Sequence, residues 1–224
     1  METRASTVDP CLVARAYQES RERIIALATD DAASSTAVAA CPGWTVRDVV
    51  AHLAAVADDW VHGRLSGPPT DEETAAQTAR FDGDGMSEIV AAWADAATRL
   101  EHLADTEGME PPLGDIACHE HDIRTALGRP GARDSSAVWY STDRLLKNLR
   151  TPVPLRVTVE DAEYHSGPDG SAEIGLRTSR FEVLRWRTGR RSTRQLAAMD
   201  WSGDPTPLLD HLYLFGPTEV DIVE

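Results

Sequence analysis

The apolar positions of the first 150 residues recur at helical spacing in five separate segments. The first predicted helix covers residues 9–28 and opens with an Asp-Pro pair, in which a capping side chain precedes a proline at the first helical position. The clearest pattern follows a Pro-Gly-Trp loop. There Thr45 and Asp48 resemble a capping box, and they open a second helix that carries apolar residues over 45–65.

Three more helices are predicted between residues 87 and 149. One covers 87–103 with Ser87 as its cap, one covers 113–127 after a Pro-Pro pair and ends at a Gly-Arg-Pro-Gly stop, and one covers 136–149. The stretch 63–85 is rich in Pro, Gly, Asp and Glu, so it is predicted to be a long loop with one short helical segment at 72–80.

The pattern changes after Thr151-Pro152. Leu155, Val157 and Val159 alternate with polar residues, which is the period of a half-buried strand. The remaining predicted elements are a strand from Ala172 to Arg177, a helix from Phe181 to Arg187, a helix or strand through Leu196, a strand at Met199–Trp201 and a helix from Pro207 to Leu214. The sequence therefore predicts an α+β protein, with a helical bundle over residues 1–151 and a small α/β domain over residues 152–224.

Composition narrows the choice of partners. The 224 residues carry a formal net charge of -15, which disfavours nucleic acid and anionic membranes because binding to either begins from clustered positive charge. Three cysteines form no CxxC pair, which is typical of a reducing compartment, and each is interpreted as a small buried apolar residue. With no signal-like or membrane-spanning apolar run, we expect a cytoplasmic protein, as a monomer or homodimer.

One candidate for metal chemistry lies on the fourth predicted helix. Asp115 and His119 are four residues apart, so they share a face and can converge on one ion. Zinc accepts imidazole nitrogen and carboxylate oxygen together, and His52 on the second helix is the natural third ligand, which would leave one position open. The alternatives are an exposed Asp-His pair and a packed core histidine, and the spacing does not decide between them.

Neighbouring polar residues receive supporting roles. Asp122 lies three residues after His119 and can accept a hydrogen bond from its other ring nitrogen. Glu120 and His121 point elsewhere, because consecutive helical residues face different directions. In the second domain Arg190 and Arg191 are candidates to bind a carboxylate of the substrate or of a thiol cofactor, with solvated surface arginines as the alternative.

Two stretches of the chain resemble a known family. The run from Cys41 to Leu53 (CPGWTVRDVVAHL) and the run from Asp115 to Gly128 resemble the two signatures of the mycothiol-dependent maleylpyruvate isomerase family, which belongs to the DinB-like metalloenzyme superfamily. Residues 179–201 extend the similarity into the tail. The resemblance implies a DinB-like four-helix bundle that binds a divalent metal, expected to be zinc, through His52, Asp115 and His119, followed by a small α/β sandwich. Asp115 departs from the glutamate usual in that family.

The same resemblance implies an activity. Its cofactor would be mycothiol, whose sulfur takes the open metal position and acts as a thiolate on a small electrophilic substrate, by isomerisation or by S-transfer. Two other functions stay open. One is a metal-dependent hydrolase, in which the open position carries water, and the other is a non-catalytic protein that binds metal or thiol under stress.

Overall fold

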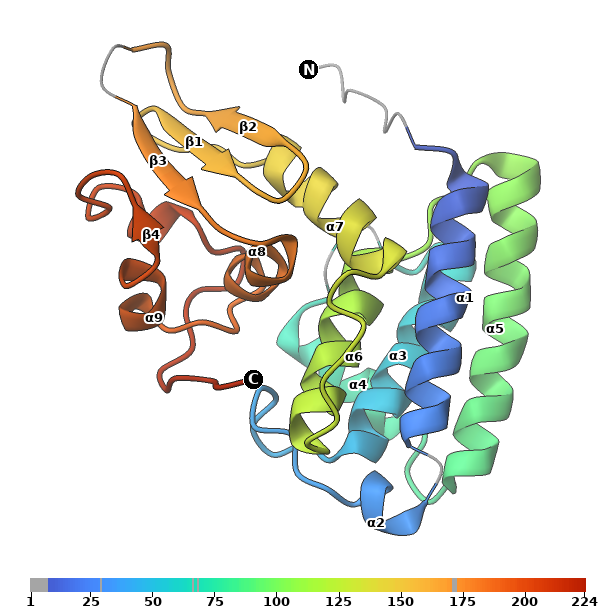
Figure 1. Ribbon diagram of the computed structural model, residues 1–224. Helices are drawn as coiled ribbons and strands as arrows, with labels where there is room; N and C mark the ends of the chain where they lie inside the picture. The colour runs from blue at the N-terminus through green and yellow to red at the C-terminus, as the bar shows by residue number, and fades with distance from the viewer. Residues whose placement is uncertain (1–7, 29, 66, 68, 171–172) are drawn as a thin grey trace. The chain divides into compact units, whose positions relative to one another are not determined.

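The computed structural model describes residues 8–28, 30–65, 67, 69–170 and 173–224. The chain divides into two compact units, residues 1–131 and 132–224 (Figure 1). The helices of the first unit are α1 (Pro10–Leu27), α2 (Asp31–Ser34), α3 (Val46–Val61), α4 (Asp71–Ala79), α5 (Met86–Glu107) and α6 (Leu113–Ala126). The second unit contains α7 (Ser136–Lys147), β1 (Leu155–Thr158), β2 (Glu163–Ser166), β3 (Ile174–Arg177), α8 (Arg180–Arg187), α9 (Thr193–Ala197), β4 (Asp200–Trp201) and the 3-10 helix η1 (Leu209–His211).

Four long helices form the bundle of the first unit. Helix α3 packs against α5 and α6, and α1 packs against the same two helices, so the four surround one core (Figure 1). Most of α3 is buried, including the whole stretch from Val49 to Ala57. A helix that is apolar nearly all round lies inside a bundle rather than on its surface. This burial places any polar residue of mid-α3 in the interior.

The capping signals explain where the first helices begin. Asp9 caps α1 by accepting a hydrogen bond from the backbone of Cys11, with Pro10 as its first residue, as predicted. The capping box at the start of α3 is also present, with the Thr45 side chain bonded to the backbone of Asp48 and the Asp48 side chain bonded to that of Thr45. Both predictions from local sequence are confirmed.

Three predictions about helices were wrong. Helix α5 begins at Met86 with Gly85 in the cap position, and the Ser87 hydroxyl instead donates to Glu88. Helix α3 ends at Val61 rather than near residue 65, because Gly63 takes a left-handed conformation there. The predicted helix over 207–214 is reduced to the 3-10 turn η1.

The second unit is built around a four-stranded sheet in the order β2-β1-β3-β4. Strand β1 pairs antiparallel with β2 and parallel with β3, and β4 adds antiparallel to β3. Leu155 and Val157 of β1 are buried, as the alternating pattern predicted. The turn before β3 requires Gly167, where a side chain would lie 2.3 Å from the Val153 carbonyl oxygen. The observed architecture is α+β, as predicted; Ala172, the predicted start of β3, lies outside the described residues.

Helix α7 packs against α8 and falls in the second unit. The sequence prediction instead grouped it with the bundle, in the division into 1–151 and 152–224. The division into two independently folding domains, 1–151 and 152–224, stays a prediction.

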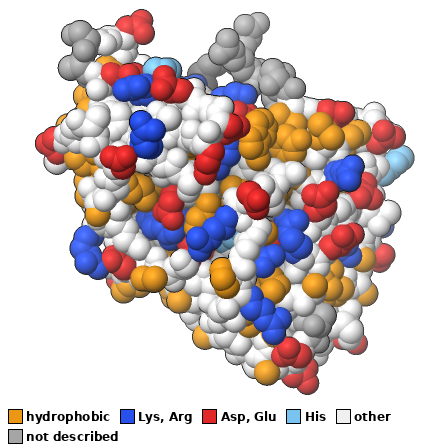
Figure 2. Space-filling model, viewed as in Figure 1, with side chains coloured by type: hydrophobic (Ala, Val, Ile, Leu, Met, Phe, Trp, Pro, Cys, Tyr) orange, Lys and Arg blue, Asp and Glu red, His pale blue; other side chains and the backbone are white. Residues whose placement is uncertain are grey.

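The charges of this acidic chain are spread rather than gathered on the face that Figure 2 shows. There, acidic and basic side chains are interspersed. None of the helices in the described part of the chain is both long and apolar enough to cross a membrane.

A buried aspartate anchors α4 to the bundle. Asp59, near the end of α3, accepts hydrogen bonds from Arg64 at 2.7 Å, from Arg80 at 2.5 and 2.9 Å and from Gln77 at 2.9 Å. Burial by itself raises the pKa of Asp59, but these hydrogen bonds outweigh it and hold the pKa below its ordinary value. Because the folded pKa is lowered, the stabilisation is present at neutral pH and is lost only as the pH falls through that lowered value.

We therefore expect Asp59→Asn to lower the free energy of unfolding by about 1–3 kcal/mol at neutral pH, since it weakens hydrogen bonds to two arginines. Urea denaturation measures the loss. Asp58→Asn is the matched control, because Asp58 pairs with the same arginines but is exposed, and it should cost about 0–1 kcal/mol. Equal losses in the two variants would show that Asp59 has no special anchoring role.

Candidate metal site in the helical bundle

A tight loop prepares the start of α3 and orients one aromatic ring. The backbone of Val38 donates to the Trp44 carbonyl at 2.9 Å, and that of Val46 donates to Thr36 at 2.9 Å. Gly43 takes a positive φ of 86°, which favours glycine at this point of the turn. The Trp44 ring then lies against the His52 ring, with 5.3 Å between the centroids. The Pro-Gly-Trp signature therefore builds one wall around His52.

Two buried histidines and an aspartate converge between α3 and α6. The Nε2 atom of His52 lies 3.6 Å from one oxygen of Asp115, and the Nε2 atom of His119 lies 3.6 Å from the other. The two imidazole rings meet edge to face at 5.2 Å. His52 and His119 are 2% and 7% exposed, whereas the Asp115 side chain is 28% exposed. The two histidines are therefore buried, whereas the Asp115 side chain is partly exposed although its Oδ2 atom, which faces His52, is buried.

These distances suit a metal site better than a hydrogen-bonded cluster. A separation of 3.6 Å is too long for an N–H···O hydrogen bond. Ligands around one tetrahedral zinc ion, at about 2.0–2.2 Å from it, lie about 3.3–3.6 Å from one another. His52, Asp115 and His119 are one of the sets of side chains in the described part of the chain whose ligand atoms all lie within 4.8 Å of each other. The donor set therefore fits a divalent ion.

Asp122 lies beside the Nδ1 atom of His119, on the opposite side of the ring from Asp115. Its carboxylate lies 3.0 Å from Nδ1 of His119, and it is 1% exposed. A hydrogen on Nδ1 that is donated to this carboxylate leaves Nε2 as the acceptor nitrogen, the form that can bind a metal. The geometry expected from the three-residue spacing is thus present.

The bundle core near Asp115 holds a buried tyrosine. Tyr17 is buried, and its hydroxyl accepts a hydrogen bond from the Trp93 indole at 2.9 Å. Burial raises the pKa of Tyr17, the bond from Trp93 lowers it, and the nearby charge of Asp115 raises it again, with a net rise. Tyr17 therefore stays protonated beside the carboxylate. No local sequence pattern indicates this position of Tyr17, because its surroundings arise from helix packing.

Glu120 faces away from the cluster, as helical geometry predicts. Its carboxylate accepts two hydrogen bonds from Arg23 of α1, at 2.7 and 2.8 Å, and two from Arg124, at 3.0 and 2.9 Å. Burial by itself raises the pKa of Glu120, but the two guanidinium groups outweigh it and hold that pKa below its ordinary value. This ion pair fixes α6 on α1, next to the residues that form the cluster.

The arginines predicted to bind a carboxylate lie in the second unit. Arg191 is 5% exposed, and its guanidinium binds Glu182 at 2.8 Å and Glu224 at 2.9 Å. Arg190 is half-buried and donates to the Thr188 carbonyl at 2.6 Å. A ligand at Arg191 would have to replace one of the chain's own carboxylates. The predicted binding role of both arginines stays a prediction.

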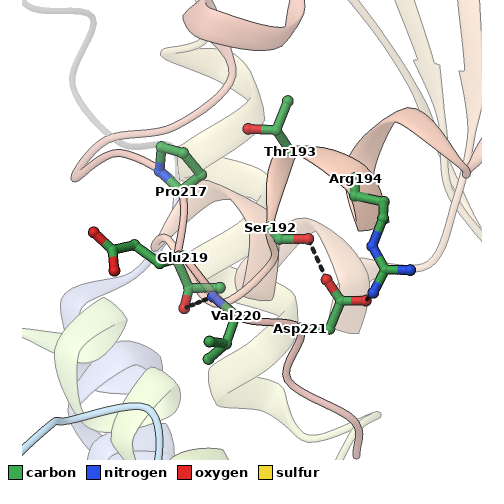
Figure 3. Close-up of a pocket in the computed structure, with 8 residues that line it drawn as sticks. Ser192, Thr193, Arg194, Pro217, Glu219, Val220 and Asp221 are labelled. Carbon is green, nitrogen blue, oxygen red and sulfur yellow. Dashed lines mark hydrogen bonds and ion pairs between the residues drawn. The ribbon is translucent and has the colours of Figure 1, made fainter.

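A surface pocket in the second unit is unrelated to the cluster. It lies between the start of α9 and the tail over residues 217–221, as Figure 3 shows. Across it, Ser192 donates to Asp221 at 2.6 Å, and Arg194 forms an ion pair with the same carboxylate. These contacts join the tail to α9. None of the three clustered residues lines this pocket, so we assign it no part in the metal chemistry.

The fold and the cluster together define the class: an α+β protein whose helical bundle gathers two imidazoles and a carboxylate suited to a divalent ion. Residues 15–145 match the family model described as the mycothiol maleylpyruvate isomerase N-terminal domain. This match spans more than half of the chain, so the chain belongs to that family.

Solved structures support the same fold. One is a mutant of the mycothiol-dependent maleylpyruvate isomerase, with a TM-score of 0.53 and 15% identity, covering 87% of this chain and 92% of that one. Another is described as the mycothiol-dependent maleylpyruvate isomerase, with a TM-score of 0.52, 15% identity and the same coverage. At this identity the likeness concerns the fold. The comparison with curated protein sequences found no match.

Proposed function

We propose that this protein is a metal- and thiol-dependent enzyme, in which His52, Asp115 and His119 hold one divalent ion, preferably zinc. The observation that carries the proposal is the convergence of two buried Nε2 atoms on the two oxygens of one carboxylate, at 3.6 Å each. Two imidazoles and a carboxylate are a common catalytic zinc set, which leaves a further position for a reacting group. Membership of the family supports mycothiol as the thiol that takes this position.

When bound, a divalent ion lowers the pKa of a coordinated thiol, so that the nucleophilic thiolate is available near neutral pH. In this proposal the chain's own residues hold the ion and orient its ligands. Asp122 keeps the proton of His119 on Nδ1, and Trp44 packs on the ring of His52. Asp115, the most exposed of the three proposed ligands, marks the side from which thiol and substrate approach. The substrate in this proposal is a small electrophile, processed by isomerisation or S-transfer.

A hydrolase is the second candidate, because the same ligand set also activates water. The exposure of Asp115 favours neither reading, since thiol and water both need access. The two differ in whether a thiol binds at the ion, and that difference is measurable.

The ligand assignment predicts the metal content of variants. Purified protein should carry close to one divalent ion per chain, and His52→Ala, Asp115→Ala and His119→Ala should each lose it, because two remaining ligands do not offset the ion's desolvation. His121→Ala is the control, since His121 belongs to neither candidate ligand set in the described chain. Asp115→Glu should retain the ion. Full occupancy in the three alanine variants, by elemental analysis, would refute the assignment.

Thiol binding predicts a spectroscopic signal. Adding mycothiol to the cobalt-substituted protein should produce an intense sulfur-to-cobalt charge-transfer band, because the thiol ionises as it binds. The His119→Ala protein, treated identically, should show none. If the cobalt protein retains its ion and gives no band at millimolar thiol, the thiol-dependent reading fails and the hydrolase reading remains.

A further inference from the structure

His119 has a second set of potential metal ligands on its other ring nitrogen. The Cys41 Sγ atom lies 3.9 Å from His119 Nδ1 and 3.7 Å from an oxygen of Asp122, and that oxygen lies 3.0 Å from Nδ1. All three donor atoms lie within 4.8 Å of one another. Cys41 comes from the loop before α3, whereas His119 and Asp122 come from α6.

The spacing of these atoms fits a single ion. Around a tetrahedral zinc-sized ion, a sulfur ligand lies about 3.5 Å from its nitrogen and oxygen neighbours, and nitrogen and oxygen lie about 3.3 Å apart. The observed separations differ from these values by a few tenths of an ångström, so small side-chain shifts would suffice. His119 and Asp122 are buried, whereas Cys41 is half-buried. An ion can therefore reach the three residues from the side of Cys41, in the loop before α3.

We propose that Cys41, His119 and Asp122 form a second metal site, selective for thiophilic cations such as Cd²⁺. Sulfur in the donor set distinguishes it from the cluster of His52, Asp115 and His119, which offers only nitrogen and oxygen. Thiolate ligands select soft ions, whereas imidazole and carboxylate also suit harder ones. The proposal does not depend on the protein being an enzyme.

The two sites exclude each other because they share one imidazole. A neutral imidazole has one acceptor nitrogen, and the other nitrogen carries the hydrogen. An ion on Nδ1 moves that hydrogen to Nε2, and His119 then offers no lone pair to an ion beside His52 and Asp115. The same ion also takes Asp122 away from its role as hydrogen-bond acceptor. A thiophilic cation at Cys41 therefore displaces the ion from the first site.

Cadmium absorption tests the ligand set. Titrating the metal-free protein with Cd²⁺ should produce a sulfur-to-cadmium charge-transfer band that saturates at one equivalent. Cys41→Ser should lose the band, whereas Cys11→Ser and Cys118→Ser, the matched controls, should keep it. His52→Ala should also keep it, which separates this site from the first one. A band that survives Cys41→Ser, or that disappears in His52→Ala, would overturn the assignment.

Competition tests the exclusion. With cobalt bound and no thiol present, one equivalent of Cd²⁺ should release the cobalt from the wild-type protein but not from Cys41→Ser, as followed by visible absorption and by metal content after gel filtration. Circular dichroism checks that Cys41→Ser is folded, as its spectrum should match that of the wild-type protein. Retention of one cobalt and one cadmium per wild-type chain would show that the sites are independent, and would refute the shared-imidazole argument.

Discussion

The candidate metal site depends on the packing of α3 against α6. This contact brings His52 from one helix opposite Asp115 and His119 from the other, in an interior made largely of apolar side chains. Polar groups in such an interior lower stability unless their donors and acceptors are satisfied. Within the described residues, the buried Nδ1 of His52 has no hydrogen-bond partner. The bundle therefore retains a largely buried polar cluster that lowers stability, which is typical of a functional site rather than of a core built for stability alone.

Other buried charges hold the two helices in place around that cluster. Glu120 joins α6 to α1 through Arg23, one residue away from His119. Asp59 joins α3 to α4 through Arg80, two turns after His52. Both carboxylates are satisfied by guanidinium groups, so they fix positions without taking part in the cluster. The site thus lies on two helices that ion pairs join to their neighbours, which helps to hold the ligand side chains in one geometry.

Local sequence patterns explain how much of the fold and of the candidate site could be predicted. Caps such as Asp9 and Thr45 act within one helical turn, and the alternation in β1 reflects burial of one face, so both can be found in sequence. Strand β2 was missed because none of its residues is fully buried and Tyr164 is its one apolar side chain, so the strand shows no apolar alternation. The spacing of Asp115 and His119 indicated a shared face and made His52 a candidate third ligand, but only the family resemblance favoured metal binding over a packed core histidine. Cys41 was interpreted as a buried apolar residue. Its contact with His119 could not be predicted, because it depends on how the loop over 36–45 folds.

The central claim is that an ion rests on nitrogen and oxygen ligands between α3 and α6. X-ray absorption at the zinc edge, on the zinc-loaded protein without added thiol, tests it most directly, since Zn–S bonds of about 2.3 Å are distinct from Zn–N and Zn–O bonds of about 2.0–2.2 Å. The account predicts a shell of nitrogen and oxygen with two imidazoles and no sulfur. A sulfur neighbour in that spectrum would place zinc at Cys41 instead, and would contradict the assignment of His52, Asp115 and His119 as the zinc site.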